Sequence, residues 1–288
     1  MDEELNSLRE RLEERMPGLS KSQRRIASHL LSHYDEAAFL SAADLASQLD
    51  VSEATVVRFA KAIGYDGFPQ LKRALQSVYR SEVTPAARLQ HKLAELAHNQ
   101  GHILSKVLNM EIQYLAEANR SVSAEDFDRA VALLLGAKRV FVYAGGPSAV
   151  LGYLLELRLR RFGIFCLSMN ESGRNLVEKL QLLENTDVLV LAGFNHMNRE
   201  LRVVAEHAHA IGCRTILLTD ILGASLQDQV DVVLAARRGP VSTFHSLTVP
   251  MAILNALILA VAMARPEESL AALERMQRLR AASGLDGK

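Results

Sequence analysis

The most specific chemistry in the chain lies between residues 52 and 61. A helix over this stretch would expose Glu53, Thr55, Arg58 and Lys61 on one face, with Ser52 capping its start. An arginine can make paired hydrogen bonds to a guanine edge or meet a phosphate, and a threonine hydroxyl can reach a base or a backbone oxygen. These five residues therefore form our candidate DNA-binding face.

The elements that must position this face follow the pattern of a helix-turn-helix over residues 41–64. The turn is Asp50-Val51-Ser52, and Gly64 suits the left-handed cap that ends the second helix. The apolar positions that we expect to face the core are Leu45, Ala46 and Leu49 on the first helix, and Val56, Phe59, Ala60 and Ile63 on the second. The alternative is an ordinary helical bundle with a solvated polar face.

Further basic residues could contact phosphates around this face, and each contact would steepen the salt dependence of binding. They are Lys21, Arg24, Arg25, Lys72 and Arg73. The chain as a whole has 33 basic and 33 acidic residues, so no global field attracts it to nucleic acid. DNA binding must therefore come from a local patch.

Periodicity divides the chain into two regions. Every periodic segment up to about residue 80 is helical, and Pro85 breaks the pattern before a further helical region over residues 86–119. We predict a DNA-binding domain over residues 1–80, a linker over residues 81–100 and an effector-binding domain over residues 101–288.

The second region alternates short apolar runs with amphipathic helices, which indicates a parallel sheet covered on both faces. We predict five strands and an apolar helix from Thr248 that is buried against the sheet and does not span a membrane. The five strand runs begin at Val140, Ile164, Asp187, Thr215 and Val230. The fold class is thus an all-α head plus an α/β domain with a five-stranded parallel sheet.

Ligands in such sheets bind beyond the carboxyl ends of the strands, where the strand order reverses. After the first strand, Gly146 permits a tight turn and Ser148 would lie at a helix start, where free amides favour an anion. The run lacks the third glycine of a dinucleotide fingerprint, so we expect no nicotinamide cofactor, and no metal site. The tips of the next two strands add Ser168, Asn170, Asn195, His196 and Asn198. A Gly-Gly turn that only closes a βα unit is the alternative.

The sequence resembles the RpiR family of regulators. The resemblance is carried by three runs in order: residues 20–30, residues 41–64, and Ile63-Gly-Tyr-Asp-Gly-Phe-Pro-Gln-Leu. It implies a winged or extended helix-turn-helix head followed by a sugar isomerase (SIS) domain that holds a phosphosugar. It also implies a homodimer or homotetramer that binds double-stranded operator DNA.

The sequence departs from the family at the loop after the third strand. Where the family tends to show a Ser-x-Ser-Gly-x-Thr-like run, residues 192–200 read Ala-Gly-Phe-Asn-His-Met-Asn-Arg-Glu, so the phosphate-cradling hydroxyls are absent. Arg199, with the asparagines and His196 of this loop, could supply other donors for an anionic ligand. His245 and Ser246, before the last apolar helix, could also face the pocket, although a structural role is an equal alternative.

These observations favour a ligand-responsive transcriptional regulator with no catalytic residues. The alternatives are a sugar-phosphate isomerase with an accessory head, and a DNA-binding scaffold whose SIS fold only dimerises. Isomerisation needs a positioned acid and base, and no spacing in the pocket loops demands them. Cys166 and Cys213 lie in apolar contexts and are expected to be buried free thiols in a reducing cytoplasm.

Overall fold

The computed structural model describes the chain except residues 1–2, 39, 83–84, 99–100, 195–196, 221–225, 240–244 and 285–288. It divides into two compact units. The first holds residues Met1–Lys106 and Gly239–His245, and the second holds Val107–Arg238 and Ser246–Lys288. The change of unit along the chain therefore falls between Lys106 and Val107, within one helix.

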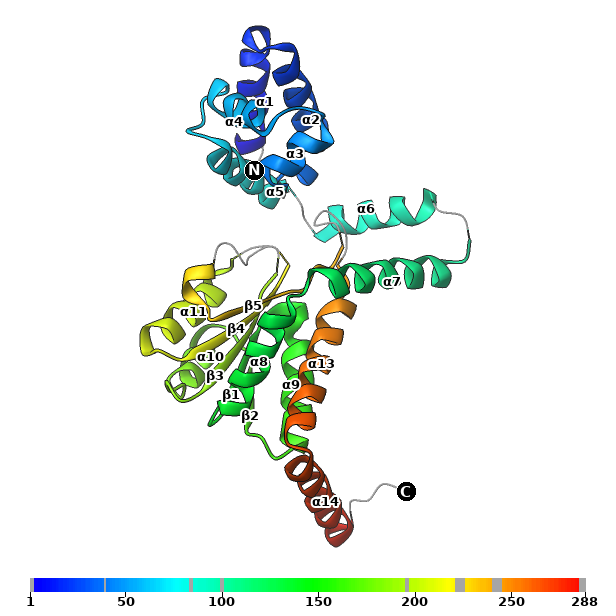
Figure 1. Cartoon of the computed structure of the whole chain (residues 1–288), viewed down its shortest axis with the longest axis vertical. Coiled ribbons are helices and arrows are strands. Elements are labelled where there is room, and N and C mark those ends of the chain that lie inside the picture. Colours follow the sequence, from blue (N-terminus) through cyan, green and yellow to red (C-terminus); the bar gives the residue numbers. More distant parts are fainter. Residues whose placement is uncertain are drawn as a thin grey trace. The chain divides into compact units, whose positions relative to one another are not determined.

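The first unit contains a helical head that has a core of its own (Figure 1). The head is built from α1 (Glu3–Arg15), a 3₁₀ turn (Met16–Gly18), α2 (Lys21–Ala37), α3 (Ala42–Gln48), α4 (Glu53–Ala62) and α5 (Phe68–Glu82). All five α-helices contribute apolar side chains that are almost fully buried. The predicted helical head is confirmed, and its core residues include all those expected from residues 45–63 except Leu49, which is half-buried.

The helical region after the head consists of two helices, α6 (Pro85–His98) and α7 (Ile103–Ser121). The interruption includes Gly101, whose φ of +109° lies in a region that favours glycine. Lys106 Nζ donates to the carbonyl oxygen of Leu96 at 2.6 Å, which ties α7 to α6.

The second unit is built on a sheet of five parallel strands in the order β2-β1-β3-β4-β5, which confirms the predicted fold class. The strands are β1 (Val140–Ala144), β2 (Cys166–Met169), β3 (Val188–Ala192), β4 (Arg214–Thr219) and β5 (Val232–Ala235). The order reverses between β1 and β3, because β2 lies on one side of β1 and the later strands lie on the other. The register aligns Ala144 with Ala192, so β1 and β3 end level with each other.

Alternate residues of the strands build two separate cores. Val140 and Val142 face α8 (Ala124–Gly136), α9 (Ala149–Arg161) and α13 (Thr248–Ala264). Phe141 and Tyr143 face α10 (Gly173–Leu180) and α11 (Arg199–Ile211). Figure 1 shows these two groups of helices on opposite sides of the sheet. Because both faces are covered, the strands are mostly apolar, as the sequence predicted, and their polar members are Ser168 of β2 and Arg214, Thr215 and Thr219 of β4.

Helix α13 packs against the sheet through residues such as Ile253 and Leu257, as predicted for the apolar segment from Thr248. It is followed by α14 (Pro266–Ser283). Among the described residues no single helix is long and apolar enough to cross a membrane. Helices α13 and α14 meet that length and apolarity only as a pair, which is bent by 103°.

Cys166 and Cys213 are buried free thiols, as predicted. Burial raises the pKa of each to about 12, so both are protonated at neutral pH.

Candidate nucleic-acid interface and ligand site

The turn between α3 and α4 is fixed by local hydrogen bonds at both helix starts. Ser41 and Asp44 form a reciprocal capping box at α3, in which the Ser41 hydroxyl accepts from the Asp44 amide at 3.0 Å. The Ser52 hydroxyl accepts from the Thr55 amide at 3.2 Å at the start of α4. Between them Asp50 has a φ of +46°, a conformation that aspartate tolerates better than most residues. The sequence predicted this turn and the Ser52 cap.

Helix α4 has one buried face and one exposed polar face, which is the arrangement a recognition helix needs. Val56, Phe59 and Ala60 are fully buried in the head core. Glu53, Arg58, Lys61 and the Ser52 cap are exposed, and Thr55 is half-buried. All five residues proposed for the DNA-binding face therefore lie together at the exposed side of this helix.

A chain of hydrogen bonds runs along the exposed face of α4. The hydroxyls of Ser52 and Thr55 lie 2.8 Å apart, and Arg58 Nη2 donates to the Thr55 hydroxyl oxygen at 3.2 Å. Because each residue orients the next, the arginine is held along the helix face while its other donors remain available. The arrangement presents a planar, fixed positive charge to solvent.

The other basic candidates of the head have different environments. Lys21, Arg24 and Arg73 are exposed, although Arg24 Nε donates to the Leu19 carbonyl oxygen at 3.0 Å. Arg25 donates to the carbonyl oxygen of Leu49 at 2.6 Å, so it stabilises the end of α3. Lys72 is half-buried, and this burial lowers its pKa against the opposing effect of Asp44.

In the second unit the strand order reverses at the carboxyl ends of β1 and β3, and we call this edge, where ligands of such sheets bind, the crevice. Gly146 follows β1 with a φ of +57° and is exposed, so the turn depends on glycine here. Ser148 precedes α9, and its side chain caps no helix amide. The predicted pair Gly146 and Ser148 therefore lies at this edge, with the serine hydroxyl at the start of a 13-residue helix.

Asn198 joins the two sides of the crevice. Its Oδ1 accepts from the Leu201 amide at 2.7 Å and caps α11, and its side chain also makes a hydrogen bond with the buried Tyr143 hydroxyl at the end of β1. A Cβ on Gly145 would lie 3.1 Å from that hydroxyl and 3.8 Å from Asn198 Nδ2. Burial raises the pKa of Tyr143, with a further contribution from Glu200, against the hydrogen bond with Asn198. The structure thus gives Asn198 a structural task at the predicted site.

Two predicted ligand residues face away from this crevice. Ser168 lies within β2 and is 7% exposed, and its hydroxyl faces Gly152 of α9, where an added Cβ would be 2.7 Å away. Asn170 is half-buried, its Oδ1 faces the same glycine, and its Nδ2 donates to the Ala149 carbonyl oxygen at 3.4 Å. The Ser168 hydroxyl and Asn170 Oδ1 are buried without a hydrogen-bond partner among the described residues.

Four predicted ligand residues remain. Asn195 and His196 lie outside the described residues. Arg199 is exposed on the first turn of α11. His245 falls in the first unit, whereas the crevice is in the second, so it is not counted among the crevice residues.

Sequence reasoning missed a buried ion pair and the half-buried ring against it, at the same edge of the sheet. Arg238 and Asp220 form an ion pair with an Nη2–Oδ2 distance of 2.9 Å, and both side chains are 6% exposed. The guanidinium carbon lies 3.9 Å from the ring centroid of Phe194. All three residues follow the carboxyl ends of strands, which is the positional signal that could have identified them.

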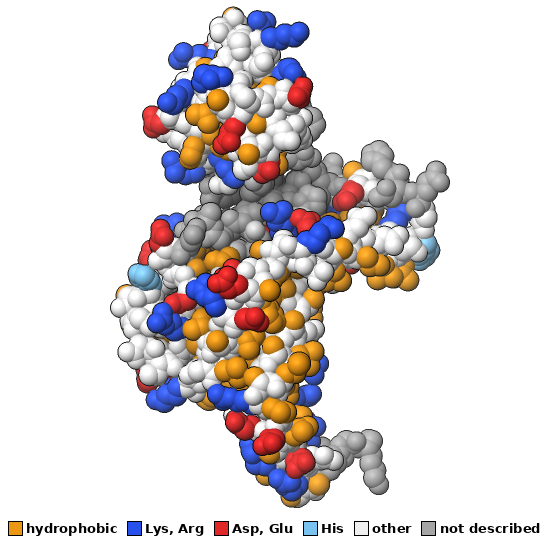
Figure 2. Space-filling view, in the orientation of Figure 1, with side chains coloured by type: hydrophobic (Ala, Val, Ile, Leu, Met, Phe, Trp, Pro, Cys, Tyr) orange, Lys and Arg blue, Asp and Glu red, His pale blue; other side chains and the backbone are white. Residues whose placement is uncertain are grey.

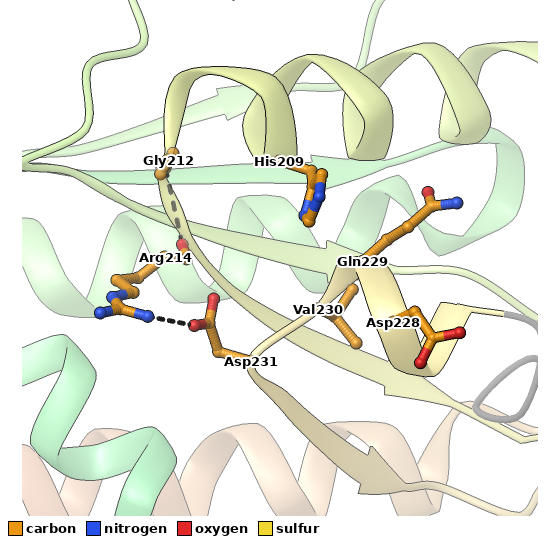
Figure 3. Close-up of a pocket in the computed structure, with 8 residues that line it drawn as sticks. His209, Gly212, Arg214, Asp228, Gln229, Val230 and Asp231 are labelled. Atoms are coloured by element: carbon orange, nitrogen blue, oxygen red, sulfur yellow. Dashed lines mark hydrogen bonds and ion pairs between the residues drawn. The ribbon is translucent and has the colours of Figure 1, made fainter.

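A pocket of about 270 Å³ lies at the opposite edge, beside the amino ends of β4 and β5 (Figure 3). Arg214 Nη1 lies 2.6 Å from Asp231 Oδ1 there. Burial acts to raise the pKa of Asp231, but hydrogen bonds from Thr215 and Arg214 bring it below its ordinary value. The pair joins the starts of two neighbouring strands, and its charges are mutually compensated, so we interpret it as structural.

Comparison with known families matches both parts of the chain. Residues 6–82 match the helix-turn-helix domain of the rpiR family, and residues 133–260 match the SIS domain. HexR of Pseudomonas aeruginosa, a helix-turn-helix transcriptional regulator, is 28% identical over 217 residues, which cover 75% of this chain and 74% of HexR. RpiR of Escherichia coli, also such a regulator, is 22% identical over 76% of this chain and 72% of its own.

Solved structures resemble both units. The sugar isomerase domain of an RpiR transcription factor from Sphaerobacter thermophilus matches with a TM-score of 0.57 and 26% identity, over 60% of this chain and 97% of that domain. NanR of Vibrio vulnificus, complexed with ManNAc-6P, shares the fold with a TM-score of 0.61 and 20% identity, over 96% and 98% of the two chains. With its rpiR-type helix-turn-helix head followed by a SIS domain, this chain belongs to the RpiR family of transcriptional regulators.

Proposed function

We propose that the protein binds a specific operator through the exposed face of α4 and releases or tightens on it when a small anionic, sugar-like metabolite binds the SIS domain. The observation that carries this proposal is the hydrogen-bonded row Ser52, Thr55 and Arg58, presented by a helix whose other face is fully buried. The row leaves the remaining donors of Arg58 on the outward side of the helix. A base-reading helix needs donors held in this way, because base discrimination depends on donor geometry.

The proposed effector site is the crevice at the ends of β1 and β3. Gly146 supplies the tight turn, and Ser148 lies at the amino end of α9, where the helix dipole favours an anion and where its hydroxyl caps no amide. NanR, which shares the fold, was solved with ManNAc-6P. These facts support a phosphorylated or otherwise anionic sugar. The regulator would respond by the difference in effector affinity between its DNA-bound and released states.

A mobility-shift titration with the DNA upstream of the gene tests this proposal directly. We expect saturable binding to one segment, altered by a compound that also raises the melting temperature in a screen of sugar phosphates, amino sugars and inorganic phosphate. Binding equal to that of unrelated DNA would contradict the operator proposal. Rapid aldose–ketose interconversion by the purified protein would favour the isomerase alternative.

Ser148→Ala is expected to reduce the affinity for the stabilising compound by about tenfold, the effect of losing one hydrogen bond to a charged group. Operator binding without the compound should stay unchanged, because the head does not depend on this hydroxyl. Isothermal titration measures the first and a mobility shift the second. Ser121→Ala, at the end of α7, is the matched control, and equal affinities for the compound in all three proteins would place the anion elsewhere.

We also propose that α13 mediates self-association into a homodimer or homotetramer. The helix carries no charged residue, and its outward positions Ala252, Ala256, Leu259 and Met263 are exposed. Leu259 and Met263 are 61% and 80% exposed. Figure 2 shows hydrophobic side chains gathered over the helical face that includes α8 and α13. An uncharged exposed stripe on this scale is typical of an interface.

Light scattering on the double variant Leu259→Glu with Met263→Glu tests this interface. We expect the mass to fall to that of a monomer, because two carboxylates would be buried per subunit without partners. Leu270→Glu on α14, where the leucine is also 61% exposed, should leave the mass unchanged. An oligomer that survives the double substitution would exclude this face.

A further inference from the structure

The buried pair Asp220 and Arg238 and the half-buried Phe194 join the carboxyl ends of three neighbouring strands. Phe194 follows β3, Asp220 follows β4 directly, and Arg238 lies beyond β5. Arg238 Nη2 and Nε both donate to Asp220 Oδ2, at 2.9 and 3.3 Å. These two hydrogen bonds use one edge of the guanidinium group. Its flat face lies over the Phe194 ring, with the guanidinium carbon 3.9 Å from the ring centroid.

Stability alone does not explain such a pair. Moving an arginine and a carboxylate out of water costs much of what their attraction returns, and apolar replacements of similar size are often no less stable. The pair does fix the orientation of the guanidinium plane. A guanidinium held by two hydrogen bonds is a fixed plane, and an aromatic ring that stacks on it has a defined position.

That position matters because Phe194 is the second residue of the chain segment between β3 and α11. The other end of the segment is held at Asn198, which caps α11 and makes a hydrogen bond with Tyr143. Gly193 is also constrained, since a Cβ there would clash with Leu201 Cδ2. The described residues of the segment are therefore fastened on both sides of the crevice.

We propose that Arg238, held by Asp220, is a positioning residue for the effector site, because its stacking fixes Phe194 beyond the carboxyl end of β3. The inference rests on the proposed function, because it assigns a role in effector affinity to residues that need not touch the effector. A salt bridge that served only the fold would leave effector affinity unchanged when replaced by apolar residues of equal size.

The same sheet offers a matched control at its opposite edge. Arg139 donates from Nη2 and Nε to the two carboxylate oxygens of Asp187 at 2.7 and 2.9 Å, and its guanidinium carbon lies 5.3 Å from the ring centroid of Phe141. Asp187 also accepts from the Glu184 amide, so replacing this second pair is the more disruptive change. The Arg139–Asp187 pair lies at the opposite edge of the sheet from the crevice. A loss of effector affinity in the Asp220–Arg238 variant alone would therefore reflect positioning of the site and not general stability.

The experiment compares two double variants of the full chain: Asp220→Leu with Arg238→Met, and Asp187→Leu with Arg139→Met. Melting temperature, operator affinity and affinity for N-acetylmannosamine 6-phosphate and for the strongest stabiliser in the thermal screen are measured for each. We expect the first double variant to keep its melting temperature and operator binding but to bind the effector about 10- to 100-fold more weakly, by analogy with residues that orient the ligands of metal sites. The control pair should keep wild-type effector affinity.

Unchanged effector affinity in the first double variant overturns the inference, and so does an equal loss in both pairs. Phe194→Leu, with Phe141→Leu as its control, repeats the test while both ion pairs stay intact. These single variants still measure the effect on effector affinity if a double variant does not fold. A wild-type protein that binds none of the screened compounds overturns the effector site itself. That failure is separate, because it is seen before any substitution is made.

Discussion

Replacing Phe59 by alanine is expected to destabilise the head by about 3–5 kcal/mol and to abolish operator binding. Phe59 is on α4 and has no exposed surface, and its ring is among the largest fully buried side chains of the molecule. The substitution leaves a cavity beneath the exposed face that carries Arg58. Because a domain is stable by only about 5–15 kcal/mol, the loss is a large fraction of the total.

Calorimetry of the full chain measures this effect, since a two-unit protein can show a separate transition for each unit. We expect only the head transition to move. Val57→Ala is the control on the same helix, because Val57 is half-buried and its truncation should cost about 1 kcal/mol. Equal losses for the two variants would mean that Phe59 does not anchor α4.

Arg238→Met alone is expected to destabilise the sheet unit by about 3–5 kcal/mol, because the Asp220 carboxylate would stay buried without its cation. Both side chains are 6% exposed, so little water reaches the pair. The companion variant Asp220→Leu leaves a buried guanidinium and should be affected in the same direction. The two together should cost far less than the sum of the single changes.

Urea denaturation of the four proteins in this cycle gives the coupling free energy between Arg238 and Asp220. A coupling of several kcal/mol is expected for a buried pair. Additive effects would show that each residue is stabilised by other contacts, and the stacking of Arg238 on Phe194 would then lose its anchor.

The fold was largely predictable because its signals are local. Helix periodicity located the head, and apolar runs located all five strands, since strands buried on both faces need apolar residues throughout. The second and fifth strands were each predicted to start two residues early, at Ile164 and Val230, whereas β2 begins at Cys166 and β5 at Val232. Phe165 is 53% exposed, so an apolar residue next to an edge strand extended the prediction beyond the paired segment.

The DNA-binding face could be predicted from the sequence more completely than the ligand crevice. The DNA-binding face lies on one helix, and a single helical period assigns its exposed side, so Ser52 through Lys61 were found together. The residues of the ligand crevice depend on which way the side chains at the strand ends point. Ser168 was placed at a tip, but its side chain faces α9 across Gly152. Asp220 and Arg238 are 18 residues apart in sequence, and only the strand order brings them together.

The most direct test of the whole account is the operator affinity of Arg58→Ala, measured by mobility shift over a range of salt concentrations beside wild type and an Arg202→Ala control on α11. If α4 reads bases, the alanine variant should bind its operator more weakly by about 1–3 kcal/mol while keeping most of its affinity for unrelated DNA. Wild-type operator affinity in Arg58→Ala would contradict the assignment of α4 as the helix that enters DNA.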